Sequence, residues 1–386
     1  MSYSRREFGK LALAGLPAAV LIGRGESIFG AFAPAKPNSR IHGVQIGAIT
    51  YSYRSMPDQS GEATLKYLID SGLSACELMD GPAEMFAGRP QAAQRGGGPG
   101  GAGGRGGGRR GEPAPLQAGP GQKIGEWHGQ QCLVSTETGQ VVAQGFGGGG
   151  RGRGQQTPEQ VAEQQEAAKT LKDWRTSVSM DRFKQLRKMY NDAGVTIYAY
   201  KTDGMQKNMQ TSNEELDYMF NVAAALGATH TTMELPSGPD AEAMLKRMAS
   251  FAEKHKVAIA YHTHLQGSMT AFDQAFAVSK WSMSNVDLGH WVAGGNQGGT
   301  PIDFLSKYHD RIASVHIKDR TTPEHCSLNV AWGEGDTPLT QILQMLKKNK
   351  WKIPASIELE YNIPEGSDAV KEARKCVDYC RKVLTA

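Results

Sequence analysis

Apolar and amphipathic stretches alternate along the second half of the chain. Five short apolar runs are separated by stretches with a helical repeat of apolar residues, such as Ala241–Lys256 and Pro301–Asp310. This alternation is typical of βα units that build a parallel sheet. The five runs are Ala228–Glu234, Val257–His264, Asn285–His290, Ile312–Lys318 and Pro354–Glu360.

Three further apolar runs precede these five. They are Ile41–Ile49, Ser74–Met79 and Val195–Tyr200, and together the eight runs supply the strands of a (β/α)₈ TIM barrel. The intervening helices are predicted at Met180–Ala193, which Gly194 ends, at Ser212–Leu226, which Gly227 ends, and at Ser367–Leu384, the last outer helix. We therefore expect an α/β protein whose barrel occupies residues 40–386.

The chain is longer than one barrel requires. It has 386 residues, whereas a TIM barrel needs about 250. Part of the surplus lies in residues 86–174, after the second strand. Within it Arg95–Gly111 and Gly145–Gly154 consist almost entirely of glycine and arginine, which predicts a low-complexity, partly disordered insertion. Between and after these stretches we expect a small hairpin in Lys123–Gln144 and a helix over Pro158–Lys172 capped by Thr157. The insertion leaves the barrel on its catalytic face, either as a lid or as a solvated linker.

The remaining surplus is the N-terminal segment 1–35. Its motif Ser-Arg-Arg-Glu-Phe-Gly-Lys at Ser4–Lys10 resembles the twin-arginine (Tat) export signal, and the apolar stretch Leu11–Ile22 is too short to span a bilayer comfortably. We expect a Tat signal peptide, the Tat export machinery as a partner, a periplasmic or exported protein and no stable membrane anchor. The alternative is an amphipathic helix with a chance Arg-Arg pair.

Composition excludes some functions. The net charge of +4 arises from 43 basic and 39 acidic residues, too weak an excess for a nucleic-acid-binding protein. Five scattered cysteines do not suggest a disulfide framework, and Cys376 and Cys380 are expected to be packing residues on one helix face. Nothing in the sequence sets the oligomeric state.

Candidate metal ligands lie at the C-terminal ends of the five later runs. In a closed barrel these ends converge on one pocket, and carboxylates with a histidine suit an oxygen-preferring divalent ion. Strand parity turns Glu234 into the barrel mouth, and Glu358 is expected to lie deeper than Glu360. Lys318 is placed to polarise a carbonyl or to pair with a substrate anion. The candidates are Glu234, His262, His264, Asp287, His290, His316, Lys318, Glu358 and Glu360.

These residues resemble the pattern of the xylose isomerase-like TIM-barrel superfamily, which includes sugar phosphate isomerases and epimerases, ketose 3-epimerases, inosose dehydratase-like proteins and endonuclease IV. The similarity covers about Ile41–Tyr361 apart from the insertion. The run Tyr261–His264 is similar to that of the inosose dehydratase-like members. The resemblance implies His290 as a substrate contact and one divalent ion held by Glu234, Asp287, His316 and Glu358.

The expected activity is isomerisation or epimerisation of a sugar or sugar derivative, by removal of a proton next to a metal-bound carbonyl. Glu234 and Glu358 would transfer the proton, with Lys318 or His290 stabilising the oxyanion. His262, His264 and His290 would bind the substrate, and Mn²⁺ or Mg²⁺ is favoured over Co²⁺ or Zn²⁺.

Three alternatives stay open. The same barrel could act as a lyase or hydrolase on 3-keto-glycosides, which share the first proton abstraction. A non-catalytic periplasmic sugar-binding protein would keep the pocket without needing the glutamates as bases. Hydrolysis of phosphodiesters, as in endonuclease IV, is disfavoured because the chain has only 10 histidines and several lie away from the strand ends.

Overall fold

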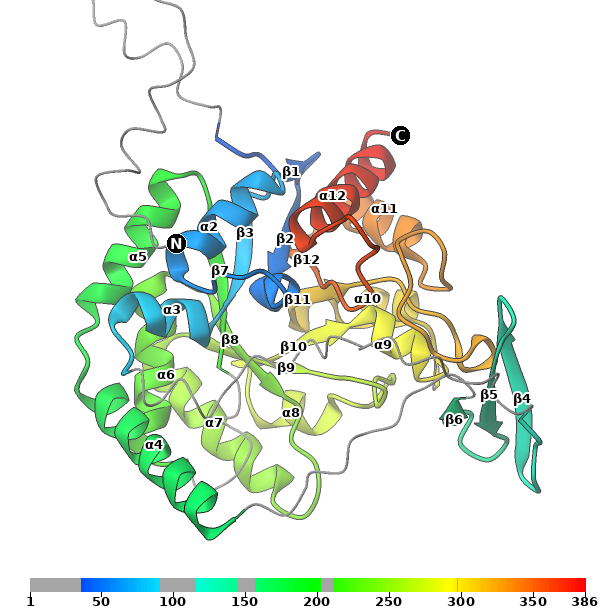
Figure 1. Ribbon diagram of the computed structural model, residues 1–386, viewed down its shortest axis with the longest axis horizontal. Helices are drawn as coiled ribbons and strands as arrows, with labels where there is room; N and C mark the ends of the chain where they lie inside the picture. The colour runs from blue at the N-terminus through cyan, green and yellow to red at the C-terminus, as the bar shows by residue number, and fades with distance from the viewer. Residues whose placement is uncertain (1–35, 91–115, 145–156, 203–210, 297) are drawn as a thin grey trace, which may run out of the picture. The chain divides into compact units, whose positions relative to one another are not determined.

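The computed structural model describes residues 36–90, 116–144, 157–202, 211–296 and 298–386 (Figure 1). Residues 36–386 form one compact unit. The expected Tat signal, and both glycine- and arginine-rich stretches of the insertion, lie outside the described residues, so these expectations stay predictions. In the described part of the chain, no helix has the length and apolar character needed to cross a membrane.

Eight parallel strands close into a barrel, which confirms the expected (β/α)₈ fold. Each strand pairs with its neighbours in the order β2-β12-β11-β10-β9-β8-β7-β3, and β3 pairs again with β2. A short strand β1 (Arg40–Ile41) adds to β2 in antiparallel orientation. The barrel strands are β2 (Val44–Ile49), β3 (Ala75–Met79), β7 (Thr196–Lys201), β8 (His230–Glu234), β9 (Ala258–His262), β10 (Ser282–Asp287), β11 (Ile312–Ile317) and β12 (Ala355–Ile357).

Helices surround the strands (Figure 1). Those expected from the apolar repeat are present, and α6 carries both predicted end signals: a capping box of Ser212 with Glu215, and Gly227 in a left-handed conformation at its C-terminus. The helices are α2 (Gly61–Asp70), α3 (Asp80–Ala87), α4 (Pro158–Ser177), α5 (Asp181–Asp192), α6 (Asn213–Leu226), α7 (Ala241–His255), α8 (Asp273–Val278), α9 (Leu288–Ala293), α10 (Pro301–Tyr308), α11 (Leu339–Asn349) and α12 (Ala369–Thr385), with short 3₁₀ turns η2 (Thr50–Tyr53), η4 (His309–Arg311) and η5 (Pro323–His325).

The sixth barrel strand differs from its prediction. The expected strand Asn285–His290 is in fact β10, which ends at Asp287, and Leu288–Ala293 forms α9. The change of conformation occurs at Asp287, because its carboxylate accepts a hydrogen bond from the backbone N–H of His290 at 2.6 Å and so caps the new helix. His290 therefore lies in the first turn of a helix and not on a strand.

The interior of the barrel is partly polar. The hydroxyl of Tyr198 reaches across the barrel to Ser356 at 2.8 Å, and His230 Nε2 lies 2.9 Å from Ser314 Oγ. A glycine at position 47 makes room for this arrangement, since a Cβ there would lie 2.7 Å from the Tyr198 ring. This hydrogen-bonded layer lies along the same strands that carry the candidate ligands.

The described part of the insertion contains a small sheet and a helix. Its strands β4 (Gln122–Trp127), β5 (Gln130–Ser135) and β6 (Val141–Gln144) form a three-stranded antiparallel sheet, one strand more than the expected hairpin. Helix α4 begins as predicted with Thr157 as its cap, and it continues five residues beyond Lys172 to Ser177.

Two of the five cysteines form a disulfide. Cys132 of β5 is bonded to Cys326, which lies 194 residues further along the chain, so the expectation from cysteine spacing was wrong for this pair. Cys376 and Cys380 are buried on α12, which confirms their role in packing.

Candidate functional site

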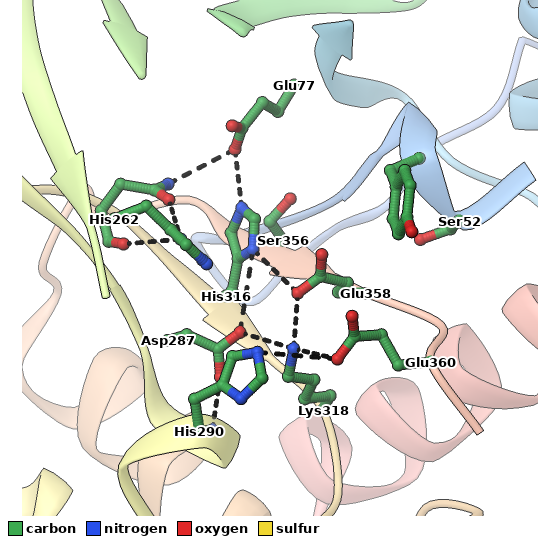
Figure 2. A network of polar contacts seen from close by, with 12 residues as sticks. Ser52, Glu77, His262, Asp287, His290, His316, Lys318, Ser356, Glu358 and Glu360 are labelled. Carbon is green, nitrogen blue, oxygen red and sulfur yellow. Dashed lines mark hydrogen bonds and ion pairs between the residues drawn. The ribbon is translucent and has the colours of Figure 1, made fainter. Parts of the chain in front are cut away.

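The C-terminal ends of the barrel strands bring ionisable side chains from seven strands to one place. Figure 2 shows several of them, among them Glu77, Asp287 and His316. Sequence reasoning had found most of them, and the structure adds Glu77 and Lys201. The residues are Glu77 on β3, Lys201 on β7, Glu234 on β8, His262 on β9, Asp287 on β10, His316 on β11 with Lys318 just beyond it, and Glu358 and Glu360 just beyond β12.

His316 is the most enclosed member of the site. Its Nε2 lies 2.8 Å from Glu77 Oε2, and its Nδ1 lies 3.2 Å from Glu358 Oε2 and 3.9 Å from Asp287 Oδ2. Burial opposes a charge on the imidazole, yet the carboxylates of Glu77 and Glu358 outweigh burial and raise the pKa of His316 to about 10. The surroundings of Nδ1 therefore favour positive charge, and a cation bound there would displace the proton.

Four buried side chains form a group with the spacing of a metal site. One possible ligand atom from each lies within 4.8 Å of the others, and the four residues are His262, Asp287, His316 and Glu358. His262 uses its Nδ1 to contact Asn285 Oδ1 at 2.8 Å, and burial lowers the pKa of His262 to about 3, so its ring is neutral. Three of the four predicted metal ligands are members of this group.

Glu234, the fourth predicted ligand, lies beside this group and not within it. Its two oxygens contact Lys201 Nζ at 3.2 Å and His264 Nε2 at 3.0 Å. Burial works against its charge, but His264 and Lys201 hold the pKa of Glu234 well below the usual range. Glu234 is therefore ionised at neutral pH. Its role as a metal ligand stays a prediction. In the group of four, the fourth member beside Asp287, His316 and Glu358 is His262 and not Glu234.

Lys318 lies among three carboxylates. Its Nζ is 3.0 Å from Asp287 Oδ2, 2.8 Å from Glu358 Oε2 and 2.5 Å from Glu360 Oε2. Burial alone would lower the pKa of Lys318, but these carboxylates raise it above its ordinary value. Two of the three carboxylates belong to the metal-type group, so the ammonium lies beside the place that a metal ion would take.

The charges of the site fit a divalent cation. Five carboxylates (Glu77, Glu234, Asp287, Glu358 and Glu360) face three cations (Lys201, Lys318 and Arg320), which leaves an excess of two negative charges when the histidines are neutral. The group of two carboxylates and two imidazoles suits Mn²⁺, Co²⁺ or Zn²⁺, and the carboxylates also admit Mg²⁺. The donor set and the charge balance therefore both fit a bound divalent ion.

Two predicted substrate-binding histidines border this group. The rings of His264 and His290 lie 4.5 Å apart, and His264 is half exposed while His290 is buried. Arg320, which sequence reasoning missed, donates a hydrogen bond to His290 Nδ1. Burial, with Lys318 and Arg320 nearby, lowers the pKa of His290, so its ring is neutral. His290 Nε2 faces Glu360 Oε2 at 3.6 Å.

A buried layer supports the ligands from below. Glu77 accepts hydrogen bonds from Thr232 at 2.7 Å and from Asn285 at 3.3 Å, in addition to its contact with His316. Asn285 in turn contacts His262, so one network orients both imidazoles. Glu77 was not among the predicted site residues, although it lies near the end of the predicted strand Ser74–Met79. A signal was present, because a carboxylate inside an apolar strand requires a partner.

Comparison with known proteins agrees with the fold. Residues 161–382 match the model of the family described as xylose isomerase-like TIM barrel. A crystal structure of a sugar phosphate isomerase/epimerase from Parabacteroides distasonis ATCC 8503 is 15% identical, covers 89% of this chain and 96% of its own, and has a TM-score of 0.51. The probable 3-DHS dehydratase AsbF from Bacillus anthracis, involved in petrobactin synthesis, is 12% identical, covers 89% and 99%, and has a TM-score of 0.52. At these identities the two structures show a shared fold only. A search of curated proteins found no match.

Proposed function

The chain belongs to the xylose isomerase-like TIM barrel family, and on this premise we propose that it is a divalent-metal-dependent isomerase or epimerase of a sugar or sugar derivative. The observation that carries the proposal is the buried group of His262, Asp287, His316 and Glu358 at the C-terminal end of the barrel. A divalent ion held there would polarise the carbonyl and the neighbouring hydroxyl of a substrate and acidify the C–H bond next to the carbonyl.

Two ionised glutamates face this place from opposite sides. Their strands, β8 and β12, are four steps apart in either direction around the barrel. The side chain of Glu234 is 36% exposed, so a substrate can reach it, whereas Glu358 is nearly buried. Lys318 and His316 hold the pKa of Glu358 well below its usual range against the effect of burial. Epimerisation would need Glu234, ionised, to remove the proton, and Glu358, after taking a proton from solvent, to supply that proton to the opposite face of the substrate.

The cationic side chains complete the assignment. Lys318 Nζ and the ring of His290 lie on the side of Glu358 and Glu360, where they would stabilise negative charge that develops on a substrate oxygen. His264, half exposed beside Glu234, would contact a substrate hydroxyl.

Deuterium exchange tests the proposal. Purified protein with Mn²⁺ is incubated in D₂O with free ketoses and with 3-keto-glycosides, and deuterium at a single carbon is the expected result. Glu234→Gln and Glu358→Gln should abolish it, while Glu242→Gln on α7, an exposed carboxylate paired with Lys246, should not. A stereoisomer as the product identifies an epimerase, and release of an aglycone identifies a lyase. Absence of exchange with every ketone-bearing sugar would overturn the proposal in favour of a sugar-binding protein.

We also propose that the protein is exported. The disulfide between Cys132 and Cys326 supports export, because such bonds persist in oxidising compartments and are rare in the cytosol. The Tat-like motif at Ser4–Lys10 gives the route.

A further inference from the structure

The sheet of the insertion is attached to the loop that follows β11. Cys132 of β5 and Cys326 of this loop form the disulfide, and with Val134 they make a small buried cluster. Polar contacts lie around the bond: Lys123 Nζ is 3.0 Å from Glu324 Oε1, and Gln144 Nε2 donates to the carbonyl of Cys326 at 3.3 Å. The loop is thus held by a segment that a TIM barrel does not itself require.

The attached part of the loop has an unusual backbone. Cys326 and Ser327 both adopt positive φ angles, of 70° and 50°, in a region that side chains other than glycine disfavour. Two such residues in succession persist only where their surroundings determine the conformation. Here the disulfide restrains Cys326, and the hydroxyl of Ser327 donates a hydrogen bond to the carbonyl of Ala293 on α9 at 2.7 Å.

Ser327 connects this backbone to the site through Arg320. The Ser327 carbonyl accepts a hydrogen bond from Arg320 Nη2 at 2.5 Å, and Nη1 of the same guanidinium donates to His290 Nδ1. A guanidinium only donates, so His290 Nδ1 must accept and the ring proton must be on Nε2. That Nε2–H is buried and donates no hydrogen bond among the described residues, and the nearest carboxylate oxygen, Glu360 Oε2, lies 3.6 Å away. Figure 2 shows the His290 ring beside Asp287 and Lys318.

We propose that the insertion sheet is a covalent clamp on this loop, which positions Arg320 so that His290 presents its Nε2–H to a substrate oxygen. The contact between His290 and a substrate oxygen rests on the proposed function, whereas the clamp on the loop does not. Arg320 is a positioning residue here, since it acts through His290. The insertion would thereby contribute to substrate binding without contacting the substrate.

The tautomer of His290 tests the clamp without any substrate. Nitrogen-15 NMR of histidine-labelled protein should show His290 protonated at Nε2 in the wild type. In Arg320→Met, and in the double variant Cys132→Ser with Cys326→Ser, a population protonated at Nδ1 should appear. If the double variant fails to fold, reduction of the folded protein with dithiothreitol, which converts the bond to two thiols and itself becomes a cyclic disulfide, makes the same test. Lys123→Gln is the matched control, because it breaks an exposed contact of the same sheet and leaves the disulfide intact.

Kinetics then test the consequence for the reaction. Loss of one hydrogen bond from His290 to the substrate should raise KM about tenfold in both the Arg320 and the cysteine variants. Turnover should fall as well, because His290 is also proposed to stabilise charge that develops on a substrate oxygen. Mn²⁺ affinity should change far less, because the group of His262, Asp287, His316 and Glu358 does not include Arg320. An unchanged tautomer together with an unchanged KM would overturn the proposal and leave the insertion sheet as a surface attachment. A shifted tautomer in a protein that exchanges no deuterium would uphold the clamp and reject the proposed function.

Discussion

Glu77 Oε2 and His316 Nε2 lie 2.8 Å apart, and both side chains are fully buried. The contact fixes the orientation of the imidazole and turns Nδ1 towards Asp287 and Glu358. The His316 and Lys201 charges outweigh burial and lower the pKa of Glu77 to about 2, so the carboxylate is available as an acceptor at neutral pH. Histidine ligands of metals are commonly held in this way by a second carboxylate.

Glu77→Gln should weaken metal binding without removing a ligand. A neutral amide accepts a weaker hydrogen bond from His316 and no longer balances a charge on it, so we expect Mn²⁺ affinity to fall by about 10- to 100-fold. Isothermal titration calorimetry measures the effect. Asp217→Asn, the same type of change on α6, where the carboxylate pairs with Lys254 and His255, is the control. Equal affinities in wild type and Glu77→Gln would show that Glu77 does not support the metal.

Metal binding should stabilise the protein, and only ligand variants should lose this effect. At a free Mn²⁺ concentration 100 times the Kd, we expect about 2.7 kcal/mol of added stability. Differential scanning calorimetry with and without a chelator measures it. His316→Ala should abolish the gain, whereas His264→Ala should retain it, because His264 contacts Glu234 outside the group of four. A gain that is lost equally in both variants would contradict this ligand set.

The strands could be predicted because most of them are locally apolar, and the exception is β10. The predicted sixth strand began too late, at Asn285, because Ser282 and Ser284 are polar, although both are fully buried. The interior of this barrel is hydrogen-bonded, so an apolar signal is missing where β10 begins. The helices were predicted more accurately, because caps such as Ser212 and Gly227 act within a few residues of sequence.

The site could be predicted only as far as strand ends determine it. Asp287, His316 and Glu358 could be predicted to lie together because parallel strands bring their ends to one place. Whether Glu234 or His262 joins these three depends on contacts that the sequence does not reveal. Lys201 pairs with Glu234 beside the group, and Asn285 contacts His262 within it. Arg320 and the Cys132–Cys326 bond depend on how a long loop folds, and 194 residues of separation leave no local pattern for the bond.

The helix that ends the insertion should depend on one buried arginine. Arg175 of α4 lies 2.7 Å from Glu84 Oε1 and 3.5 Å from Asp80 Oδ2, and Glu84 is fully buried. Arg175→Met removes a buried cation and should cost about 3–5 kcal/mol in the free energy of unfolding. Urea denaturation measures the loss. The control Lys169→Met breaks an exposed pair with Asp173 on the same helix and should change stability little. Equal midpoints for both variants would mean that α4 is not anchored by Arg175.

Export should depend on the paired arginines near the N-terminus. If Arg5 and Arg6 are recognised by the Tat machinery, changing both to lysine should keep the protein in the cytoplasm. Fractionation of cells, followed by immunoblotting, measures the distribution, and Lys10→Arg in the same segment is the control. Trapping of free thiols should then show Cys132 and Cys326 reduced in the retained protein, since the cytosol maintains thiols. Unchanged fractionation of the lysine variant would mean that the motif is accidental.

Lys318→Met should raise metal affinity while it lowers activity. The Lys318 ammonium lies within 3.0 Å of oxygens of Asp287 and Glu358, two of the four residues proposed to hold the ion, and like charges this close repel. Without that ammonium we expect Mn²⁺ to bind at least about tenfold more tightly, which corresponds to about 1.4 kcal/mol. Deuterium exchange should nevertheless fall by about 100-fold, because Lys318 would no longer stabilise charge on the substrate oxygen. Lys201→Met is the matched control, because it removes an ammonium that pairs with Glu234 and not with Asp287 or Glu358. It should lower exchange with a smaller gain in Mn²⁺ affinity. If Lys318→Met instead weakened Mn²⁺ binding, the ammonium would be holding the carboxylates in place for the ion and not competing with it.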